Sequence, residues 1–187
     1  MPTLFIIAGP NGSGKTTLAR EFTETENLDF LNADDIAKSM DPQNISKAYM
    51  RAGREFFRKL NEFLIAKKSV AIETTLSGKY HNRLIENFKK NGYEIKLYFI
   101  FLDNPQICIQ RIKNRVLKGG HSVPNDDVIR RFFRSKQNFI NLKKFVSYWE
   151  LYYNGGNEFI LVAHGKEFYV DIINDFLYNN FIGDNYG

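Results

Sequence analysis

The sequence predicts an α/β protein in which helices cover both faces of a parallel five-stranded sheet. Short apolar runs of strand length alternate with longer stretches of helical composition, and the runs show little polar alternation. Such runs are typical of parallel sheets, because these sheets are buried on both faces. The chain has 187 residues, enough for one domain and short for two, so we expect a single domain over 1–187.

The first half of the chain is predicted to contain three strands and three helices. Residues 4–8 form a short apolar run, residues 30–31 a brief second run before NADD, and residues 69–73 a third that stops at two threonines. The stretches that follow these runs have helical composition (16–26, 46–67 and 79–90). The last of them ends at Asn91-Gly92, a common C-terminal stop for a helix.

The second half continues the same alternation. Residues 94–102 (EIKLYFIFL) are the strongest strand candidate in the chain. The remaining elements are a helix that ends at Gly119-Gly120, a long helix, a last strand and a last helix (105–118, 126–148, 159–163 and 168–178). Strands that alternate with helices in this way predict βαβ units and a parallel sheet.

Composition narrows the class of protein. The apolar content of 43% and aromatic content of 15% are enough for a sizeable core. The single cysteine, Cys108, excludes an internal disulfide and a Cys-cluster metal site. Apolar runs stay well short of the roughly 20 residues of a membrane helix, and the N-terminus has no basic region typical of a signal peptide. We therefore expect a cytoplasmic protein without a membrane partner.

Basic residues are concentrated in one segment. The whole chain carries a net charge of +5, but residues 108–144 contain ten lysines and arginines against two acids. That segment therefore has a net charge of +8, and the rest of the chain is acidic. A solvated basic face is one interpretation, and a surface that meets phosphates of a substrate or a nucleic acid is the other.

Residues 9–16 read GPNGSGKT, which is the pattern G-x-x-x-x-G-K-T between a predicted strand and a predicted helix. This context is typical of a P-loop, in which glycines let backbone N–H groups surround a phosphate chain at a helix N-terminus. Lys15 is predicted to reach the β- and γ-phosphates, Thr16 to bind Mg²⁺, and Thr17 to lie near the α-phosphate. A glycine-rich turn without a ligand is the alternative. The predicted nucleotide-binding residues are Gly9, Pro10, Asn11, Gly12, Ser13, Gly14, Lys15, Thr16 and Thr17.

Acidic and hydroxyl side chains follow two of the strands. Ligands of parallel sheets bind beyond the carboxyl ends of the strands, where Asp34, Glu73 and Thr74 are predicted to lie. Asp34 is the first choice for a catalytic base, because an alcohol acceptor must be oriented and lose a proton during phosphoryl transfer. Glu73 is expected to hold Mg²⁺ through water or to contact the acceptor. The simpler interpretations are a helix cap for Asp34 and a solvent-exposed edge position for Glu73.

A helical lid is predicted over about residues 108–144. Arg111 and Arg115 are four residues apart and share a helix face. The glycine-containing loop 119–124 follows them, with His121 in it, and Arg131 lies in the next helix. Arginines of a lid can neutralise charge on a transferred phosphoryl group. Solvated helix faces, and an exposed loop position for His121, are the alternatives.

Four stretches, AGPNGSGKTT, NADDIA, AIETTLSG and IQRIKNRVLKGGHSVPNDDVIRR, resemble the zeta toxin-like P-loop kinases, and most closely their short bacterial branch. The resemblance covers about residues 4–138. It implies an adenylate-kinase-type fold, with ATP and Mg²⁺ as cofactors. It also implies phosphorylation of the 3′-hydroxyl of UDP-N-acetylglucosamine and control by a small helical antitoxin.

The resemblance also implies roles for particular residues. Asp34 matches the catalytic base, Glu55 matches a substrate-binding acid, and Arg111 or Arg115 matches a lid arginine. The nearest position to the family's second lid arginine holds a histidine here, and residues 76–91 look different, so the chemistry carries over better than the acceptor. The residues expected to bind the acceptor are Glu55, Glu73, Thr74, His121 and Arg131.

These observations predict a kinase that moves the γ-phosphate of ATP to a hydroxyl of a small molecule, such as a UDP-sugar. One alternative is an NTP-binding regulatory module that transfers nothing to an acceptor. Another is a kinase of polynucleotide 5′-hydroxyl ends, which the basic segment motivates.

Overall fold

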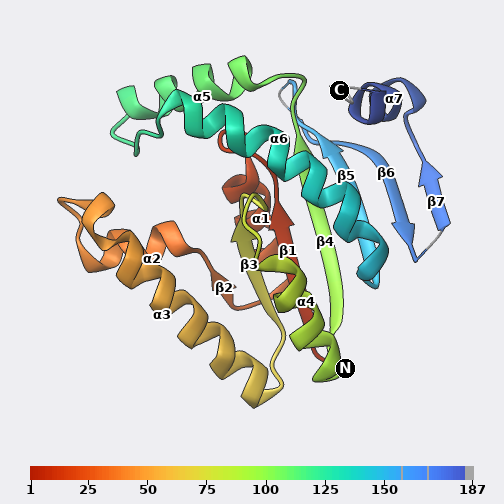
Figure 1. Cartoon of the computed structure of the whole chain (residues 1–187), viewed down its shortest axis with the longest axis horizontal. Helices are drawn as coiled ribbons and strands as arrows, with labels where there is room; N and C mark the ends of the chain where they lie inside the picture. The colour runs from red at the N-terminus through yellow and green to blue at the C-terminus, as the bar shows by residue number, and fades with distance from the viewer. Residues whose placement is uncertain (157, 168, 184–187) are drawn as a thin grey trace.

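The protein is built on one seven-stranded sheet with strand order β2-β3-β1-β4-β5-β6-β7 (Figure 1). The computed structural model describes residues 1–156, 158–167 and 169–183. Strands β2, β3, β1, β4 and β5 run parallel, and β6 and β7 add antiparallel pairs at one edge. The strands are β1 (Thr3–Ala8), β2 (Phe30–Leu31), β3 (Val70–Thr74), β4 (Glu94–Phe101), β5 (Tyr148–Tyr153), β6 (Ile160–Lys166) and β7 (Tyr169–Ile172).

Helices pack on both faces of this sheet. α1 lies behind the sheet in Figure 1, whereas α3, α4 and α6 lie in front of it. The helices are α1 (Lys15–Glu26), α2 (Ala33–Met40), α3 (Ile45–Ala66), α4 (His81–Lys90), α5 (Pro105–Leu117), α6 (Asn125–Leu142) and α7 (Asp175–Gly183), with the 3₁₀ turn η1 (Lys143–Phe145) after α6. None of the helices in the described part of the chain is long and apolar enough to span a membrane.

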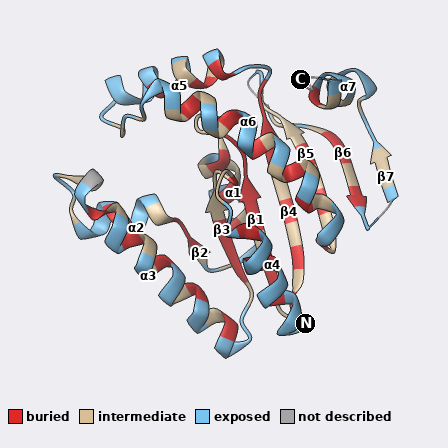
Figure 2. Cartoon of the chain, viewed as in Figure 1, coloured by how far each residue is buried: buried red, intermediate tan, exposed pale blue. Residues whose placement is uncertain are grey.

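The core lies mainly between the sheet and the front helices (Figure 2). Leu4, Ile6 and Leu97 are fully buried there, and Phe99 stacks on Phe139 of α6 with ring centroids 4.6 Å apart. A smaller cluster around Ile7 and Ala19 holds α1 against the back of the sheet. Both faces of β1 and β4 are therefore buried over most of their length, which confirms the predicted α/β fold class.

The sheet has two strands more than the five predicted, and the reason is the segment after α6. Composition predicts a helix through residue 148, but α6 ends at Leu142 and β5 begins at Tyr148. The first residues of β5, YWELYY, alternate: Trp149 and Leu151 are buried, and the other four residues of the strand are half-buried. This period of two fits a strand, and pairing with β4 places it inside the sheet.

The C-terminal part also differs from the prediction. A helix was expected over residues 168–178, whereas β7 occupies Tyr169–Ile172 and α7 begins at Asp175; Phe168 lies outside the described residues. Asn174 explains the later start, because its Oδ1 accepts a hydrogen bond from the Leu177 N–H at 3.0 Å and caps the helix. The predicted strand 159–163 is β6 and extends to Lys166.

Candidate active site

The segment between β1 and α1 forms a tight loop at the carboxyl edge of the sheet. Gly12 and Gly14 have φ angles of 79° and 95°, the left-handed region that favours glycine. A Cβ atom at Gly14 would lie 2.5 Å from Asn154 Nδ2, and one at Gly12 would lie 2.9 Å from the Cys108 carbonyl oxygen. Both positions therefore require glycine, and the spacing of the predicted P-loop sets the shape of the loop.

This loop fits a phosphate chain. Gly14 is the N-cap of α1, so the positive end of the helix dipole faces the loop. Within the described part of the chain, the buried atoms Asn11 Oδ1 and Ser13 Oγ have no hydrogen-bond partner. Buried polar atoms are normally hydrogen-bonded, and the Ser13 hydroxyl is one that can donate to a phosphate oxygen, so its lack of a partner indicates a place for a polar ligand.

Lys15 lies at the start of α1 and is only 7% exposed. Its Nζ donates a hydrogen bond to the Pro10 carbonyl oxygen at 2.9 Å, inside the loop. Burial lowers the pKa of this ammonium group, and the nearby carboxylates of Glu73 and Asp34 act in the opposite direction. The loop thus contains a desolvated cation at the place where the motif predicts one.

Glu73, at the end of β3, is held by two donors. Thr16 Oγ1 donates to Glu73 Oε1 at 3.1 Å, and Asn32 Nδ2 donates to Glu73 Oε2 at 2.7 Å. Burial raises the pKa of this carboxyl, while Lys15 and the Thr16 hydrogen bond lower it. A hydroxyl and a fixed carboxylate side by side are oxygen ligands of the kind that Mg²⁺ uses, directly or through water. Thr16 and Glu73 therefore fit the magnesium site that the sequence predicts.

Asp34 and Asp35 are both exposed in the first turn of α2. Their helix is capped by Asn32, whose Oδ1 accepts the Asp34 N–H at 2.8 Å. Asp34 acts electrostatically on Lys15 and Glu73, which places it beside the loop. Asp35 pairs with Arg20 at 3.6 Å, and its charge also acts on Glu73, less strongly than that of Asp34. The cap is therefore Asn32, and the Asp34 carboxylate is available at the cleft.

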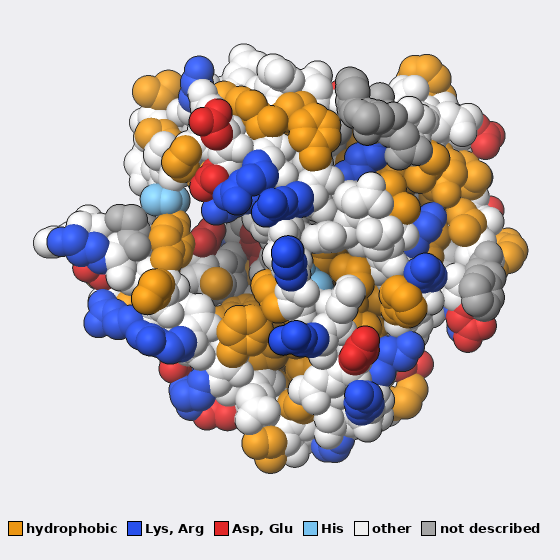
Figure 3. All heavy atoms as spheres, in the orientation of Figure 1, with side chains coloured by type: hydrophobic (Ala, Val, Ile, Leu, Met, Phe, Trp, Pro, Cys, Tyr) orange, Lys and Arg blue, Asp and Glu red, His pale blue; other side chains and the backbone are white. Residues whose placement is uncertain are grey.

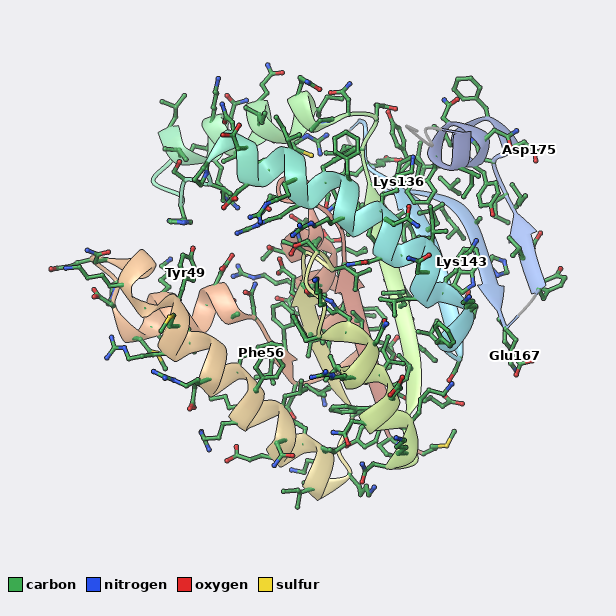
Figure 4. All side chains as sticks on the ribbon, in the orientation of Figure 1. Tyr49, Phe56, Lys136, Lys143, Glu167 and Asp175 are labelled. Carbon is green, nitrogen blue, oxygen red and sulfur yellow. The ribbon has the colours of Figure 1, made fainter. Side chains whose placement is uncertain are left out.

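A hollow separates this edge from α3 and the lid, which we define as α5, residues 118–124 and α6. Figure 3 shows acidic side chains in the depth of the hollow and lysine or arginine side chains above it. Tyr49 projects from α3 into the space below the lid (Figure 4), and its ring meets the His121 ring edge-on with centroids 5.5 Å apart. Burial and the Asp34 carboxylate raise the pKa of the Tyr49 phenol, while Arg115 and Arg131 lower it. Residues from α2, α3 and the lid therefore converge here.

The lid arginines have partners within the protein. Arg111 Nη2 donates to the Asn154 carbonyl oxygen at 2.8 Å, and the Asn154 side chain donates to the Ser13 carbonyl oxygen at 2.8 Å. Arg115 Nη2 donates to the His121 carbonyl oxygen at 2.8 Å and so shapes the lid loop. Arg131 lies 3.5 Å from Asp127. Arg111 is thus linked to the P-loop through one residue, and Arg115 acts electrostatically on Lys15 and Tyr49.

Two of the residues predicted to bind the acceptor, Glu55 and Thr74, contact neighbours on their own segments instead. Glu55 pairs with Arg58 on the same helix, at 2.6 Å. Thr74 Oγ1 lies 3.0 Å from His81 Nε2 and accepts the Leu76 N–H at 3.1 Å, so it shapes the loop after β3. The structure therefore brings Asp34, Glu73 and Lys15 together, while Glu55 and Thr74 are engaged locally.

Three residues of this arrangement were not assigned a role from the sequence. Asn32 carries a local signal, because asparagine two residues before Asp34 fits an N-cap. Asn154 and Tyr49 carry none, since they lie far along the chain from the groups they contact. Their positions follow from strand order and helix packing, which no short motif encodes.

Three known proteins show related sequences or folds. An uncharacterized protein of Haemophilus influenzae is 34% identical over 124 residues, which cover 66% of this chain and 88% of that protein. The solved PezAT chromosomal toxin-antitoxin system of Streptococcus pneumoniae matches with a TM-score of 0.69 and 15% identity, over 98% of this chain and 80% of that one. The AvrRxo1-ORF1:-ORF2 structure with ATP matches with a TM-score of 0.76 and 16% identity, over 97% of this chain and 63% of that one.

The fold and the loop at its carboxyl edge define a protein of the P-loop kinase type. The model of the family described as zeta toxin matches residues 1–161, and this chain belongs to that family. Family membership supports an ATP-dependent, kinase-type activity, and the neighbours share the fold.

Proposed function

We propose that the protein transfers the γ-phosphoryl group of ATP to a hydroxyl group of a small molecule, with UDP-N-acetylglucosamine as the first acceptor to test. The observation that carries the proposal is the group of side chains beside the P-loop. Lys15 lies inside the loop, Glu73 is fixed by Thr16 and Asn32, and Asp34 is exposed next to them. A base, a cation and a magnesium site in one cleft are what phosphoryl transfer to an alcohol requires.

In the proposed reaction, the acceptor oxygen forms a bond to the γ-phosphorus while the bond from that phosphorus to the β–γ bridging oxygen breaks. Asp34 accepts the hydroxyl proton, and ADP leaves with the bridging oxygen. Lys15 and the loop N–H groups stabilise the charge on the phosphates. Thr16 and Glu73 would hold Mg²⁺, which would supply further charge neutralisation.

The lid is proposed to complete the site. Arg115 acts electrostatically on Tyr49 and Lys15, and Arg111 bonds to Asn154, which itself bonds to the P-loop; these contacts support a role for either guanidinium at the transferred group. His121 and Arg131 are proposed to contact the acceptor, because both lie near Tyr49 at the opposite wall. Glu55 is proposed to reach the acceptor only after it leaves Arg58.

A small helical antitoxin is proposed as a protein partner. The support is membership of the zeta toxin family and the fold shared with a chain of the PezAT toxin-antitoxin system.

A mass-resolved transfer assay tests the proposed function. The protein is incubated with ATP, Mg²⁺ and separate pools of UDP-sugars, nucleosides and short RNA. We expect a UDP-sugar product heavier by about 80 Da, the mass of one added phosphoryl group. A product only in the RNA pool would make the protein a polynucleotide kinase. ATP binding without any modified acceptor would contradict the proposal and favour a regulatory module.

A further inference from the structure

A cavity of about 170 Å³ opens on the face of the sheet that carries α1, away from the hollow below the lid. It is lined by Ile7, Leu18, Phe22, Tyr98, Glu150 and Tyr152. The strand register explains this grouping, because Ile7 pairs with Tyr98 and Tyr98 pairs with Glu150 across three neighbouring strands. The cavity is thus built by the sheet itself and closed on one side by α1.

Glu150 is the charged group of this cavity. Its Oε1 accepts a hydrogen bond from Tyr148 at 2.8 Å, and its Oε2 accepts one from Tyr152 at 2.6 Å. Burial raises the pKa of both phenols, that of Tyr148 to about 12, so they remain donors at neutral pH. A carboxylate has about four acceptor positions, and the two tyrosines occupy two of them. Glu150 forms no ion pair with any lysine or arginine in the described part of the chain.

Aromatic rings form the other walls. Phe22 of α1 lies 5.2 Å from Phe5 and 5.3 Å from Tyr98, measured between ring centroids. The same aromatic strip already binds one ammonium group of the chain, because Lys96 Nζ lies 5.6 Å from the centre of the Phe5 ring. Rings attract cations through their faces, and a nearby carboxylate strengthens the attraction.

We propose that this cavity binds a small organic cation, with its alkylammonium group against Glu150 and between the rings of Phe22, Tyr98 and Tyr152. The cavity is large enough for one such head group and too small for a nucleotide. The charged groups around it are Glu150, Asp171 beside His164 two strands further, and Lys96 over the Phe5 ring, so the bound cation would share the strip with one lysine.

Choline is the probe, and 3,3-dimethylbutan-1-ol is its neutral counterpart of the same shape. Side-chain signals of Tyr98 and Tyr152 are followed by NMR while either compound is added to the full chain. We expect saturable shifts with choline in the millimolar range and binding of the alcohol that is weaker by about tenfold or more, the factor that a charge–ring and charge–carboxylate contact supplies. Equal responses to both compounds, or no saturable response to choline, would overturn the proposal.

Variants locate the site. Glu150→Gln is expected to weaken choline binding by about tenfold, whereas Glu86→Gln, which removes an exposed acid of α4, leaves it unchanged. Tyr98→Phe keeps the ring and is expected to bind, while Tyr98→Leu is expected to lose binding. If Glu150→Gln fails to fold, the Tyr98 pair decides the question. The titration needs neither ATP nor an acceptor, so its failure would leave the proposed kinase function untouched.

Discussion

The two walls of the candidate cleft are held together in different ways. On the P-loop side, Lys15, Asn32 and Glu73 are buried or half-buried. Lys15 donates a hydrogen bond to the Pro10 carbonyl oxygen, and Thr16 and Asn32 donate to Glu73, at 2.7 to 3.1 Å. On the opposite side, Glu55 pairs within its own helix, and the link to the lid is the contact between the Tyr49 and His121 rings. We infer from this difference that the P-loop side is pre-organised for phosphate and that the opposite side, the proposed acceptor half, adapts on binding.

The largest effect is expected at the pre-organised wall. Lys15→Met removes the buried ammonium group, so phosphoryl transfer should fall by about 10²–10³-fold, as it does when one charge-stabilising donor is lost. Lys38→Met is the control, since it removes an exposed lysine from the end of α2. The transfer rate with saturating ATP is the measurement. A Lys15→Met protein that is as active as the control would show that the loop does not act on the transferred group.

Asn32 allows a test of a single hydrogen bond on the P-loop side, the one that it donates to Glu73. Asn32→Asp can still accept the Asp34 N–H and cap α2, but it cannot donate to Glu73 and adds a negative charge beside it. Transfer should fall by roughly tenfold to a hundredfold, the value of one hydrogen bond to a charged group. Asn32→Ala loses the cap as well, so its melting temperature should fall further. Wild-type transfer in Asn32→Asp would limit Asn32 to capping.

The raised pKa of Glu73 predicts a pH effect. Transfer requires the ionised carboxylate, so activity should fall as pH decreases through a pKa above the ordinary 4.5. Because the folded state holds this proton more tightly than the unfolded state does, Glu73 adds stability as pH falls through that pKa. Rate and melting temperature measured over the same pH range should therefore diverge. If the transfer rate and the melting temperature fall together as pH decreases, unfolding and not protonation of Glu73 causes the loss of activity at low pH.

A smaller effect is expected on the opposite side of the cleft, where Tyr49 of α3 meets the lid. Tyr49→Ala removes the ring that meets His121, so hydrogen exchange of residues 118–123 should rise by about two- to tenfold, the value of one aromatic contact. Tyr49→Phe keeps the ring and should match the wild type. If Tyr49→Ala leaves exchange unchanged, the ring contact does not hold the lid loop.

The difference between the two sides of the cleft also explains which parts of the site could be predicted from the sequence. The alternation of short apolar runs with helical stretches predicted the fold class. The P-loop and its glycines are local in the chain, so their spacing predicted the shape of the loop. The neighbourhood of Asp34 and Glu73 followed from the rule that parallel strands end at one edge. Tyr49 and Asn154 could not be found in this way, because helix packing and the added strands bring them to the site.

Strand β5 could not be predicted from local sequence either, and the reason is again a tertiary contact. The residues of β5 follow a long helix without a glycine or proline between them, and composition alone continued the helix through residue 148. Pairing with β4 and burial of Trp149 decide in favour of the strand. Tertiary contacts thus override local preference where the sheet gains an additional member.

The most direct test of the central claim compares two neighbouring acids. Asp34→Asn and Asp35→Asn are measured for ATP dissociation constant and for single-turnover transfer to the acceptor found in the mass-resolved assay. The account predicts that Asp34→Asn binds ATP normally and loses about 10²–10⁴-fold in transfer, the contribution of a positioned base. Asp35→Asn should lose far less transfer, because Asp35 pairs with Arg20 at the surface and acts on Glu73 less strongly than Asp34 does. Near wild-type transfer by Asp34→Asn, or an equal loss in both variants, would contradict the assignment of Asp34 as the base.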